Sequence, residues 1–473
     1  MLATYVGAPP GPRTPSPKCR PSARRHPRNL AERCTLMADD PIGGGPESTD
    51  WIRRGLVGAT WIAMSVFWGF ALTRWIDPRW PHVHAAFLSP GQDFREHLRD
   101  LSALLGHSNP YVLRDRLNDT TPPSTAYLFL PFSWLSTPMA ELASVISSLA
   151  ALAASEAMLL ATVTRLGRAR ALLVSAGFLS PLAAAGLLPV FETIVNGQLY
   201  LWLMALVIAD LLVIQPRRSG VLIGAMTALV FWPVLFVVAV IARSRGRGML
   251  LFAAGAIGVT AAAAIAAPSA SWDYFTSVLP SGHATLREVV TVLPHGLGSL
   301  AVIGNQSLHG WFLRPPLSPW LAIPWAYGVA ALGIIAVGTI TAWRLLRQSE
   351  IVVAMIVLAI TCLLATPFGW LHHWVWVVLF PFGAISCWHR RRALAIVLVL
   401  GLIPFIHGVG VLVTAQGAVA HEGIVTMIRI NAPTLVGLII LGAATCSSLW
   451  AAPAARARHA SSDPFAHVAA LPF

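Results

Sequence analysis

Residues 351–392 read IVVAMIVLAITCLLATPFGWLHHWVWVVLFPFGAISCWHRRR. Two apolar runs, 351–366 and 372–388, are separated by a short polar segment, and the second ends at a run of arginines. An apolar helix of roughly 17–25 residues crosses the hydrocarbon core of a bilayer. Arginines that follow such a helix mark the cytoplasmic side. The stretch therefore predicts two antiparallel membrane helices.

The whole chain has the same character. Of its 473 residues, 56% are hydrophobic and only 11% are charged, whereas an average soluble protein has roughly 25% charged residues. The apolar runs do not alternate as the strands of a membrane β-barrel do. We therefore expect an all-α polytopic membrane protein located in the cell membrane.

Arginine-rich turns predict the orientation of the spans, because cytoplasmic loops carry the excess of positive charge. Residues 219–242 have arginines on both sides and Trp232-Pro233 in the middle, which favours a broken hairpin over a crossing. We expect about ten crossings in addition to this hairpin, with both termini in the cytoplasm. The expected spans lie near 56–75, 140–164, 171–190, 199–214, 249–266, 318–342, 351–366, 372–388, 393–414 and 432–451.

The chain ends are polar and arginine-rich. We expect residues 1–55 to form a disordered cytoplasmic tail. Residues 56–452 are expected to form the membrane domain, and residues 453–473 a cytoplasmic C-terminal tail. Met37 is an alternative start. The formal net charge of +13 comes from these tails and turns, and no basic module with interleaved aromatic residues predicts nucleic-acid binding. The five cysteines lack CxxC spacing, so a metal site is not predicted.

Two long loops, about 76–123 and 267–316, are expected outside the cell. In the first, Phe94, Leu98, Leu101 and Leu105 recur with helical spacing, which predicts a helix lying on the membrane surface. Asp93 stands at its start. Asp93 is either an ordinary helix cap or a functional carboxylate.

Further polar residues gather at the predicted outer face. Gln198 opens one span, Asn305 and Gln306 lie in the second loop before Arg314, and the pair His372-His373 opens another span. Helix capping and interfacial anchoring are the plain interpretations. Together, however, these residue types would form a site for an anion such as a phosphate.

The motifs occur in a fixed order along the chain: Asp93-Phe94, Gly106-His107-Ser108-Asn109-Pro110-Tyr111, Pro122-Pro123, Gly197-Gln198, Asn305-Gln306-Ser307-Leu308 with Arg314 downstream, and Thr366-Pro367-Phe368-Gly369-Trp370-Leu371-His372-His373. In this order, across residues 56–450, the chain resembles glycosyltransferase family 87. That family comprises actinobacterial polyprenol-phosphate-mannose-dependent mannosyltransferases of the GT-C fold. The chain differs at Tyr200, where the family commonly has Asn, and at Trp232, where it often has Lys.

The resemblance implies roles for these residues. Asp93 would accept the proton of an acceptor hydroxyl, and Arg314, His372 and His373 would stabilise the leaving lipid phosphate. Asn305, Gln306 and Gln198 would hydrogen-bond sugar or phosphate oxygens. A single displacement would invert the anomeric centre, and no metal or cofactor is implied.

The predicted function is transfer of a hexose, mannose above all, from a polyprenol-phosphate donor to a glycolipid or lipoglycan of the cell envelope. The predicted site is extracytoplasmic, and its partners are the donor, a glycolipid or glycan acceptor and the lipid bilayer. An arabinofuranosyltransferase that uses polyprenol-phosphate arabinose fits nearly as well. A lipid or solute transporter would need ionisable residues at mid-membrane. The expected spans are nearly free of them, and the exceptions Glu156 and Asp210 lie within or close to the span ends. A non-catalytic assembly partner is the remaining alternative.

Overall fold

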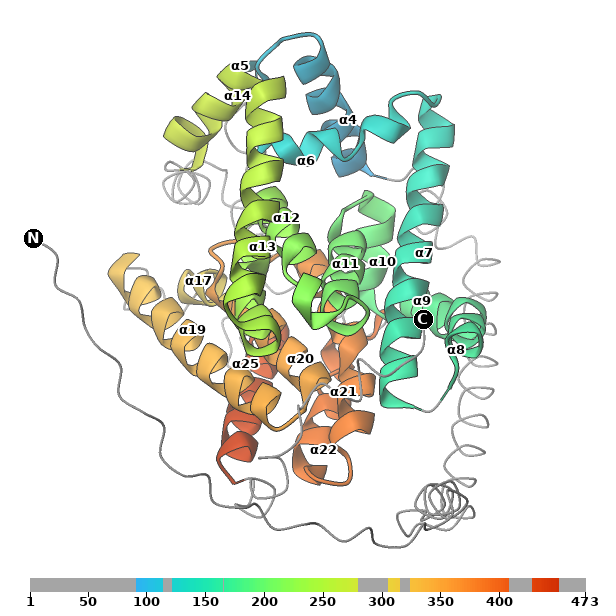
Figure 1. The fold of residues 1–473 in the computed structure, drawn as a ribbon, viewed down its shortest axis with the longest axis vertical. Helices are drawn as coiled ribbons and strands as arrows, with labels where there is room; N and C mark the ends of the chain where they lie inside the picture. Colours follow the sequence, from blue (N-terminus) through green and yellow to red (C-terminus); the bar gives the residue numbers. More distant parts are fainter. Residues whose placement is uncertain are drawn as a thin grey trace, which may run out of the picture. The chain divides into compact units, whose positions relative to one another are not determined.

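The computed structural model describes residues 91–113, 121–164, 166–279, 305–314, 324–407 and 428–450. All of them belong to the second of two units, residues 63–473. The described elements are helical (Figure 1), and the only β contacts among them are two isolated bridges, Leu187–Ile406 and Asn305–Trp370. The all-α class is thus confirmed. The span expected at 56–75 and both predicted tails lie outside the described residues.

Five helices are long and apolar enough to cross a membrane: α7 (Thr137–Val163), the run Arg168–Gly186 formed by α8, η2 and α9, the part Gly246–Ala266 of α13 (Val237–Ala266), Trp325–Arg347 in α19 (Pro324–Arg347), and α25 (Ala432–Leu449). A sixth span results if α10 (Leu188–Asn196) and α11 (Tyr200–Leu212), bent by 113°, count as one. The other apolar helices have 10–17 residues. The chain is therefore a polytopic membrane protein, and the count of ten crossings stays a prediction.

The segment 219–243 follows the course of the expected hairpin. Its first residues lie at the end of α11, where the buried carboxylate of Asp210 accepts hydrogen bonds from the backbone N–H of Gly220, Leu222 and Ile223. The chain runs through α12 (Val221–Val230), breaks at Phe231 and turns back through η4 (Trp232–Phe236). It returns to Arg243, which donates to the carbonyl of Leu211. Asp210 is thus a helix cap at this end of the molecule.

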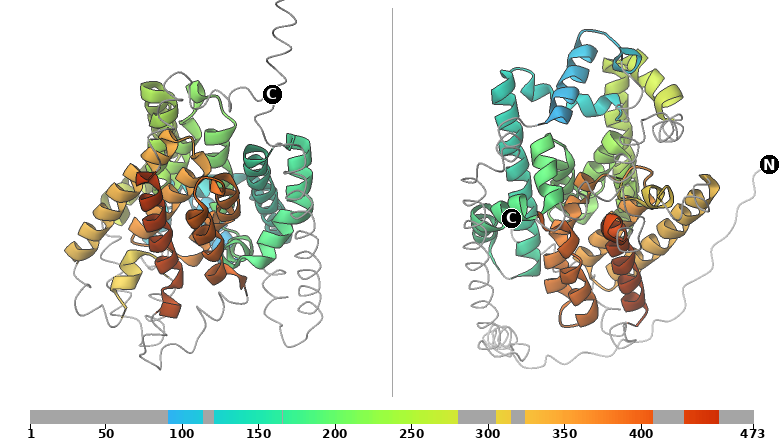
Figure 2. Two further views of the ribbon diagram at one scale, coloured as in Figure 1. Left: turned by 90° about the horizontal axis from the view of Figure 1, so that it is seen from below. Right: turned by 180° about the vertical axis from the view of Figure 1, so that it is seen from behind.

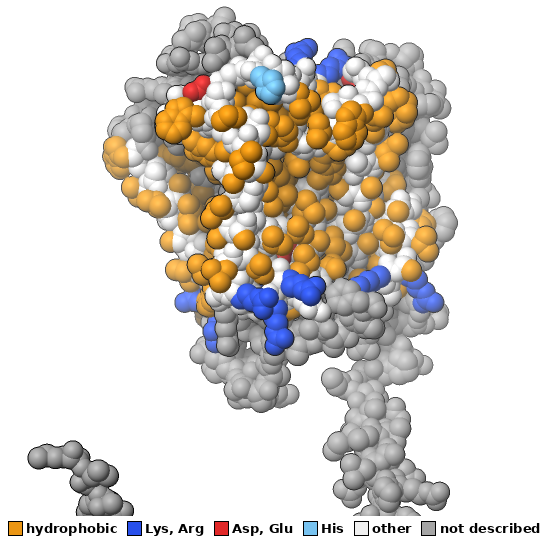
Figure 3. All heavy atoms as spheres, turned by 45° about the horizontal axis from the view of Figure 1, so that its top comes forward, with side chains coloured by type: hydrophobic (Ala, Val, Ile, Leu, Met, Phe, Trp, Pro, Cys, Tyr) orange, Lys and Arg blue, Asp and Glu red, His pale blue; other side chains and the backbone are white. Residues whose placement is uncertain are grey.

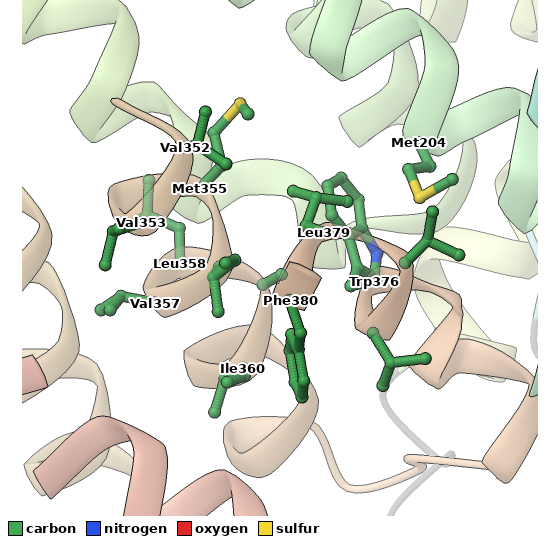
Figure 4. Close-up of a cluster of buried hydrophobic side chains, with 14 of the residues drawn as sticks. Met204, Val352, Val353, Met355, Val357, Leu358, Ile360, Trp376, Leu379 and Phe380 are labelled. Atoms are coloured by element: carbon green, nitrogen blue, oxygen red, sulfur yellow. The ribbon is translucent and has the colours of Figure 1, made fainter. Parts of the chain in front are cut away.

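The stretch 351–392 forms the centre of the fold. Every residue of α20 (Ile351–Ala365) from Ile351 to Leu364 is buried, as expected for a helix that is apolar all round. Met355 and Leu358 belong to the same buried cluster as Trp376 and Phe380, which come from the following η6 (Leu371–Val378) and α21 (Leu379–Cys387). Figure 4 shows these side chains together.

Arginines mark one end of the apolar surface. Figure 3 shows a broad hydrophobic band with a row of Arg side chains along one edge and fewer at the other. Nine of the twelve exposed arginines among the described residues stand at these turns and helix ends: Arg168, Arg170, Arg217, Arg218, Arg247, Arg344, Arg347, Arg390 and Arg392. The other three, Arg95, Arg99 and Arg429, lie in other segments. This distribution is what the positive-inside pattern predicts. Which side faces the cytoplasm stays a prediction.

Short helices from both predicted outer loops gather at the opposite end from α22 (Arg392–Leu400) (Figures 1 and 2). They are α4 (Gln92–Leu105), α5 (Pro110–Leu113), α6 (Pro123–Tyr127), η1 (Leu130–Phe132), α14 (Pro268–Asp273) and η5 (Tyr274–Val278). The side-chain amide of Asn109 donates to Asp273, so the two loops meet as expected.

The predicted helix at residues 93–105 exists, and much of its apolar face packs against the protein. Phe94 and Leu101 are fully buried in a cluster with Phe129 and Phe132, and Phe94 meets both of these rings edge-on at 5.5–5.6 Å. The aromatic side chains of the α6–η1 segment cover this face, which a pattern of spacing alone cannot show. Helix α4 is therefore packed on the protein through Phe94 and Leu101, while Leu105 at its end is exposed, and its position on the membrane surface stays a prediction.

Candidate active site

Asp93 and Gln198 meet where two glycines let their helices approach. Gly197, at φ 67, makes the corner between α10 and α11, and Gly91, at φ 73, precedes α4. A Cβ atom on Gly197 would lie 2.5 Å from Cβ of Phe94, and one on Gly91 would lie 2.5 Å from the carbonyl oxygen of Asn196. Only glycine fits this approach at positive φ. Beside it, the side-chain amide of Gln198 donates a hydrogen bond to the Asp93 carboxylate.

Asp93 is not the helix cap. Gly91 is the N-cap of α4, and no side chain caps this helix, so the carboxylate in the first turn is used for the contact with Gln198. Burial raises the pKa of Asp93 above its ordinary value of 3.8, the hydrogen bond from Gln198 opposes this, and the nearby Glu96 raises it further. A carboxylate with a raised pKa is a stronger base, which suits proton abstraction.

The histidine pair lies beside the same corner. The ring of Tyr200, two residues after Gln198, is 4.3 Å from the ring of His373 and 5.5 Å from that of His372, measured between centroids. The hydroxyl of Thr193 on α10 donates to the carbonyl of His372 over 3.0 Å. Asp93, Gln198 and the two histidines, predicted from three distant motifs, therefore surround Tyr200.

Asn305 ties the second outer loop to the histidine segment. Its Oδ1 accepts from the backbone N–H of Gly369 at 2.8 Å and of Ser307 at 3.2 Å, and its Nδ2 donates to the carbonyl of Pro367 at 2.7 Å. The backbone N–H of Gln306 adds a bond of 2.7 Å to the carbonyl of Gly369. The motif 305–307 is thus fastened to the turn 366–370 that leads directly into His372 and His373.

Gln306 and Arg314 fasten the same loop to the start of α25. Gln306 donates to the carbonyl of Ile430 at 3.1 Å. The Arg314 guanidinium donates to Asn431 and to the carbonyl of Asn305, and its side chain is only 5% exposed. Burial lowers the pKa of Arg314 to about 9, so this group is still cationic at neutral pH.

The predicted residues therefore form two groups joined by the segment 366–373. Asp93, Gln198, His372 and His373 gather around Tyr200. In the second group, Asn305, Gln306 and Arg314 are bound to backbone and side chains of the protein, where they hold the histidine segment in place. Whether the second group also touches a donor stays a prediction.

Sequence reasoning missed some neighbours of the site. Thr193 and Glu192 lie in a short apolar helix whose pattern marks neither of them. Glu192 is half-buried and makes no hydrogen bond or ion pair with the residues that the structure describes. Tyr200 and Trp232 stood out only as departures from a family pattern, and the structure places their rings in contact, 6.4 Å apart. Within the described ranges, no group of three His, Cys, Asp or Glu side chains could hold a metal ion.

Comparison with known proteins agrees with these motifs. The model of glycosyltransferase family 87 matches residues 120–367, about half of the chain. A polyprenol-phosphate-mannose-dependent alpha-(1-2)-phosphatidylinositol mannoside mannosyltransferase of Mycobacterium tuberculosis is 31% identical over 301 residues, which are 60% of this chain and 66% of the relative. A protein of the same description from Mycolicibacterium smegmatis is 29% identical over 295 residues, 58% of this chain and 63% of the relative. The match thus spans slightly less than two thirds of each relative, and no solved structure matches.

Proposed function

Because the chain belongs to glycosyltransferase family 87, we propose that it transfers mannose from a polyprenol-phosphate donor to a glycolipid or lipoglycan of the cell envelope. The names of both relatives specify this donor and a phosphatidylinositol mannoside acceptor. The observation that carries the proposal is the contact between Asp93 and Gln198 beside the histidine pair. It brings a base and candidate phosphate ligands together from distant parts of the chain.

The proposed reaction is a single displacement. The acceptor hydroxyl oxygen attacks the anomeric carbon of the donor while its proton passes to the Asp93 carboxylate. The bond from the anomeric carbon to the phosphate oxygen breaks, and the polyprenyl phosphate leaves with the electron pair. Attack from the face opposite the phosphate inverts the anomeric centre, so a β-linked donor gives an α-linked product.

The leaving phosphate needs positive partners as its charge develops. His372 and His373 are proposed to donate hydrogen bonds to it, together with Gln198. Arg314, at the end of the loop 305–314, supplies a fixed positive charge. A charge in a water-poor site acts more strongly on its neighbours than one in bulk water. Asn305 and Gln306 keep this loop against the histidine segment and complete the proposed donor site.

The membrane explains why the donor is lipid-linked. The polyprenyl tail can stay among lipid-facing helices while the phosphate and sugar reach the short helices at the end that carries α4. We infer that this end is extracytoplasmic and that both termini are cytoplasmic, because most of the exposed arginines gather at the opposite edge (Figure 3).

The test is transfer by the purified full-length protein in vesicles. These are supplied with polyprenol-phosphate mannose and phosphatidylinositol mannosides, with polyprenol-phosphate arabinose as the competing donor. Asp93→Asn is expected to abolish mannosyl transfer, and Glu96→Gln, which removes a carboxylate three residues away on the same helix, is the matched control. Undiminished transfer by Asp93→Asn removes Asp93 from the mechanism, and transfer of arabinose alone overturns the assignment of mannose.

A further inference from the structure

A row of aromatic rings begins beside Asp93. The ring of Tyr200 is stacked with that of Trp232, with planes 27° apart. Trp232 in turn meets Trp376 edge-on at 5.4 Å, and Trp376 stacks with Phe236 at 5.1 Å. These rings come from the start of α11, the break after α12 and η6. The periodicity of a single helix does not produce such a row.

The two ends of this row differ in burial. Trp376 and Phe236 are fully buried in the core, whereas Tyr200 and Trp232 are only half-buried. The inner pair therefore fixes the row, and the outer pair is less enclosed than the inner one. Rings held in place before a ligand arrives lose little conformational freedom on binding. Tyr200 and Trp232 thus form a preorganised aromatic surface.

Polar groups surround this surface. The Asp93 carboxylate lies close enough to Tyr200 to interact electrostatically with its phenol. The indole N–H of Trp232 is buried and has no hydrogen-bond partner among the described residues, as is also true of Trp202, Trp311, Trp374 and Trp376. A bound molecule with oxygen atoms at its edge would provide such a partner.

We propose that Tyr200 and Trp232 are the platform on which a sugar ring of the acceptor lies. One face of a pyranose carries C–H groups that pack flat on an aromatic ring, while its hydroxyls point outward from the ring edge. The proposal rests on the proposed function, because it is the acceptor sugar that yields a hydroxyl proton to Asp93. Tyr200 is next to Asp93 and also touches His373, a proposed phosphate ligand, so its ring lies where the acceptor sugar meets the donor, and we assign it to the acceptor because Asp93 takes the acceptor proton.

The test uses octyl α-mannoside as a soluble acceptor and polyprenol-phosphate mannose as the donor. Trp232→Leu and Tyr200→Leu remove the flat ring, whereas Trp232→Phe and Tyr200→Phe keep a ring and remove the polar tip. The leucine variants are expected to raise the KM for octyl α-mannoside about tenfold, since an aromatic contact contributes about one tenfold step in affinity. The phenylalanine variants are expected to change this KM less than about threefold. In both leucine variants the KM for the acceptor is expected to rise more than the KM for the donor. Trp343→Leu, an exposed tryptophan on α19, is the matched control.

A second readout separates this proposal from the proposed function. Saturation-transfer NMR without donor is expected to show contact between the octyl α-mannoside ring protons and the wild-type protein, and the loss of this contact in Trp232→Leu. An acceptor KM within twofold of wild type in both leucine variants overturns the platform, and so does a rise in donor KM alone. If the ring contact is present but no sugar is transferred, the proposed function fails and the platform stands. If the leucine variants do not fold, Trp232→His, which keeps a smaller flat ring, must raise the acceptor KM by about threefold, and an unchanged value overturns the proposal.

Discussion

The side-chain amide of Gln198 donates a hydrogen bond to the Asp93 carboxylate, although the two residues are 105 positions apart. This bond favours the ionised carboxylate, while burial and the neighbouring Glu96 favour the protonated one. The charge state of the proposed base therefore depends on two neighbours that act in opposite directions.

This opposition predicts the pH dependence of transfer. Because the pKa of Asp93 is raised, the ionised base is lost as the pH falls through a value above 3.8, and kcat/KM falls about tenfold per pH unit below it. Gln198→Ala removes the bond that stabilises the charged form, so the acid limb moves to higher pH. Glu96→Gln removes a repulsive charge, so the limb moves to lower pH. The measurement is the pH profile of kcat/KM for the three proteins.

The two shifts check each other. If both variants moved the acid limb in the same direction, or if neither moved it, the limb would belong to a group other than Asp93. Glu96→Gln is expected to keep the wild-type rate on the plateau of the profile, which shows that the variant is folded.

The glycine corner predicts a steric effect on Asp93. Gly197→Ala places a Cβ 2.5 Å from Cβ of Phe94 in a left-handed conformation that costs about 1–2 kcal/mol for alanine. Helix α4 must move, and a displacement of about 1 Å can reduce kcat roughly a hundredfold. Gly167→Ala, where an added Cβ meets nothing within 4 Å, is expected to be neutral. Transfer rates and thermal unfolding of both variants in detergent check this, and equal activities would contradict it.

Asn305 is expected to act through stability. Its side chain is 1% exposed and makes three hydrogen bonds to the backbone, so Asn305→Ala leaves several buried groups unpaired, at about 1–3 kcal/mol each. Ser307→Ala removes the helix-cap bond that the backbone N–H of Gly310 donates over 3.2 Å and a longer bond of 3.4 Å to the carbonyl of Pro367, and is expected to cost about 1 kcal/mol. Thermal unfolding midpoints of the two variants measure this difference, and Asn305→Ala is expected to have the lower midpoint. A normal midpoint for Asn305→Ala with a raised donor KM would instead make Asn305 a direct donor ligand.

Much of this architecture follows from sequence. The apolar runs, the break at Trp232-Pro233 and the meeting of the two outer loops could be predicted because each depends on hydropathy, on proline or on the shared side of the membrane. Asp93 and Gln198 could be predicted to converge for the same reason. Their direct bond could not, because it depends on the close approach of Gly91 and Gly197, whose spacing carries no signal of contact.

Other features depended on tertiary packing. The spacing of apolar residues in α4 is the same whether lipid or protein covers its apolar face. Only the positions of Phe129 and Phe132 in the fold show that protein covers Phe94 and Leu101. The stack of Tyr200 on Trp232 joins residues that no local pattern connects. The 10–17-residue lengths of several apolar helices likewise depend on where neighbouring helices bend.

Arg314 is predicted to need its forked shape as well as its charge. It donates both to Asn431 and to the carbonyl of Asn305, which the single ammonium of lysine cannot reproduce. Arg314→Lys is therefore expected to unfold at a lower temperature than the wild type and to retain part of its kcat. Arg314→Gln also loses the positive charge, so its kcat is expected to be lower still. The comparison is of kcat per folded protein. Equal kcat in the two variants would show that the charge of Arg314 does not serve the leaving phosphate.

The sidedness of the site gives the last prediction. Ser108, between α4 and α5, and Arg217, after α11, are both exposed. The arginine pattern predicts that they lie on opposite sides of the membrane. In a cysteine-free background, Ser108→Cys is expected to react with a membrane-impermeant maleimide added to intact cells. Arg217→Cys is expected to react only after the cells are opened. Labelling of Arg217→Cys in intact cells would place the arginine-rich edge outside. A site at the α4 end would then face the cytoplasm, and the proposed extracytoplasmic reaction would fail even if Asp93 proved essential.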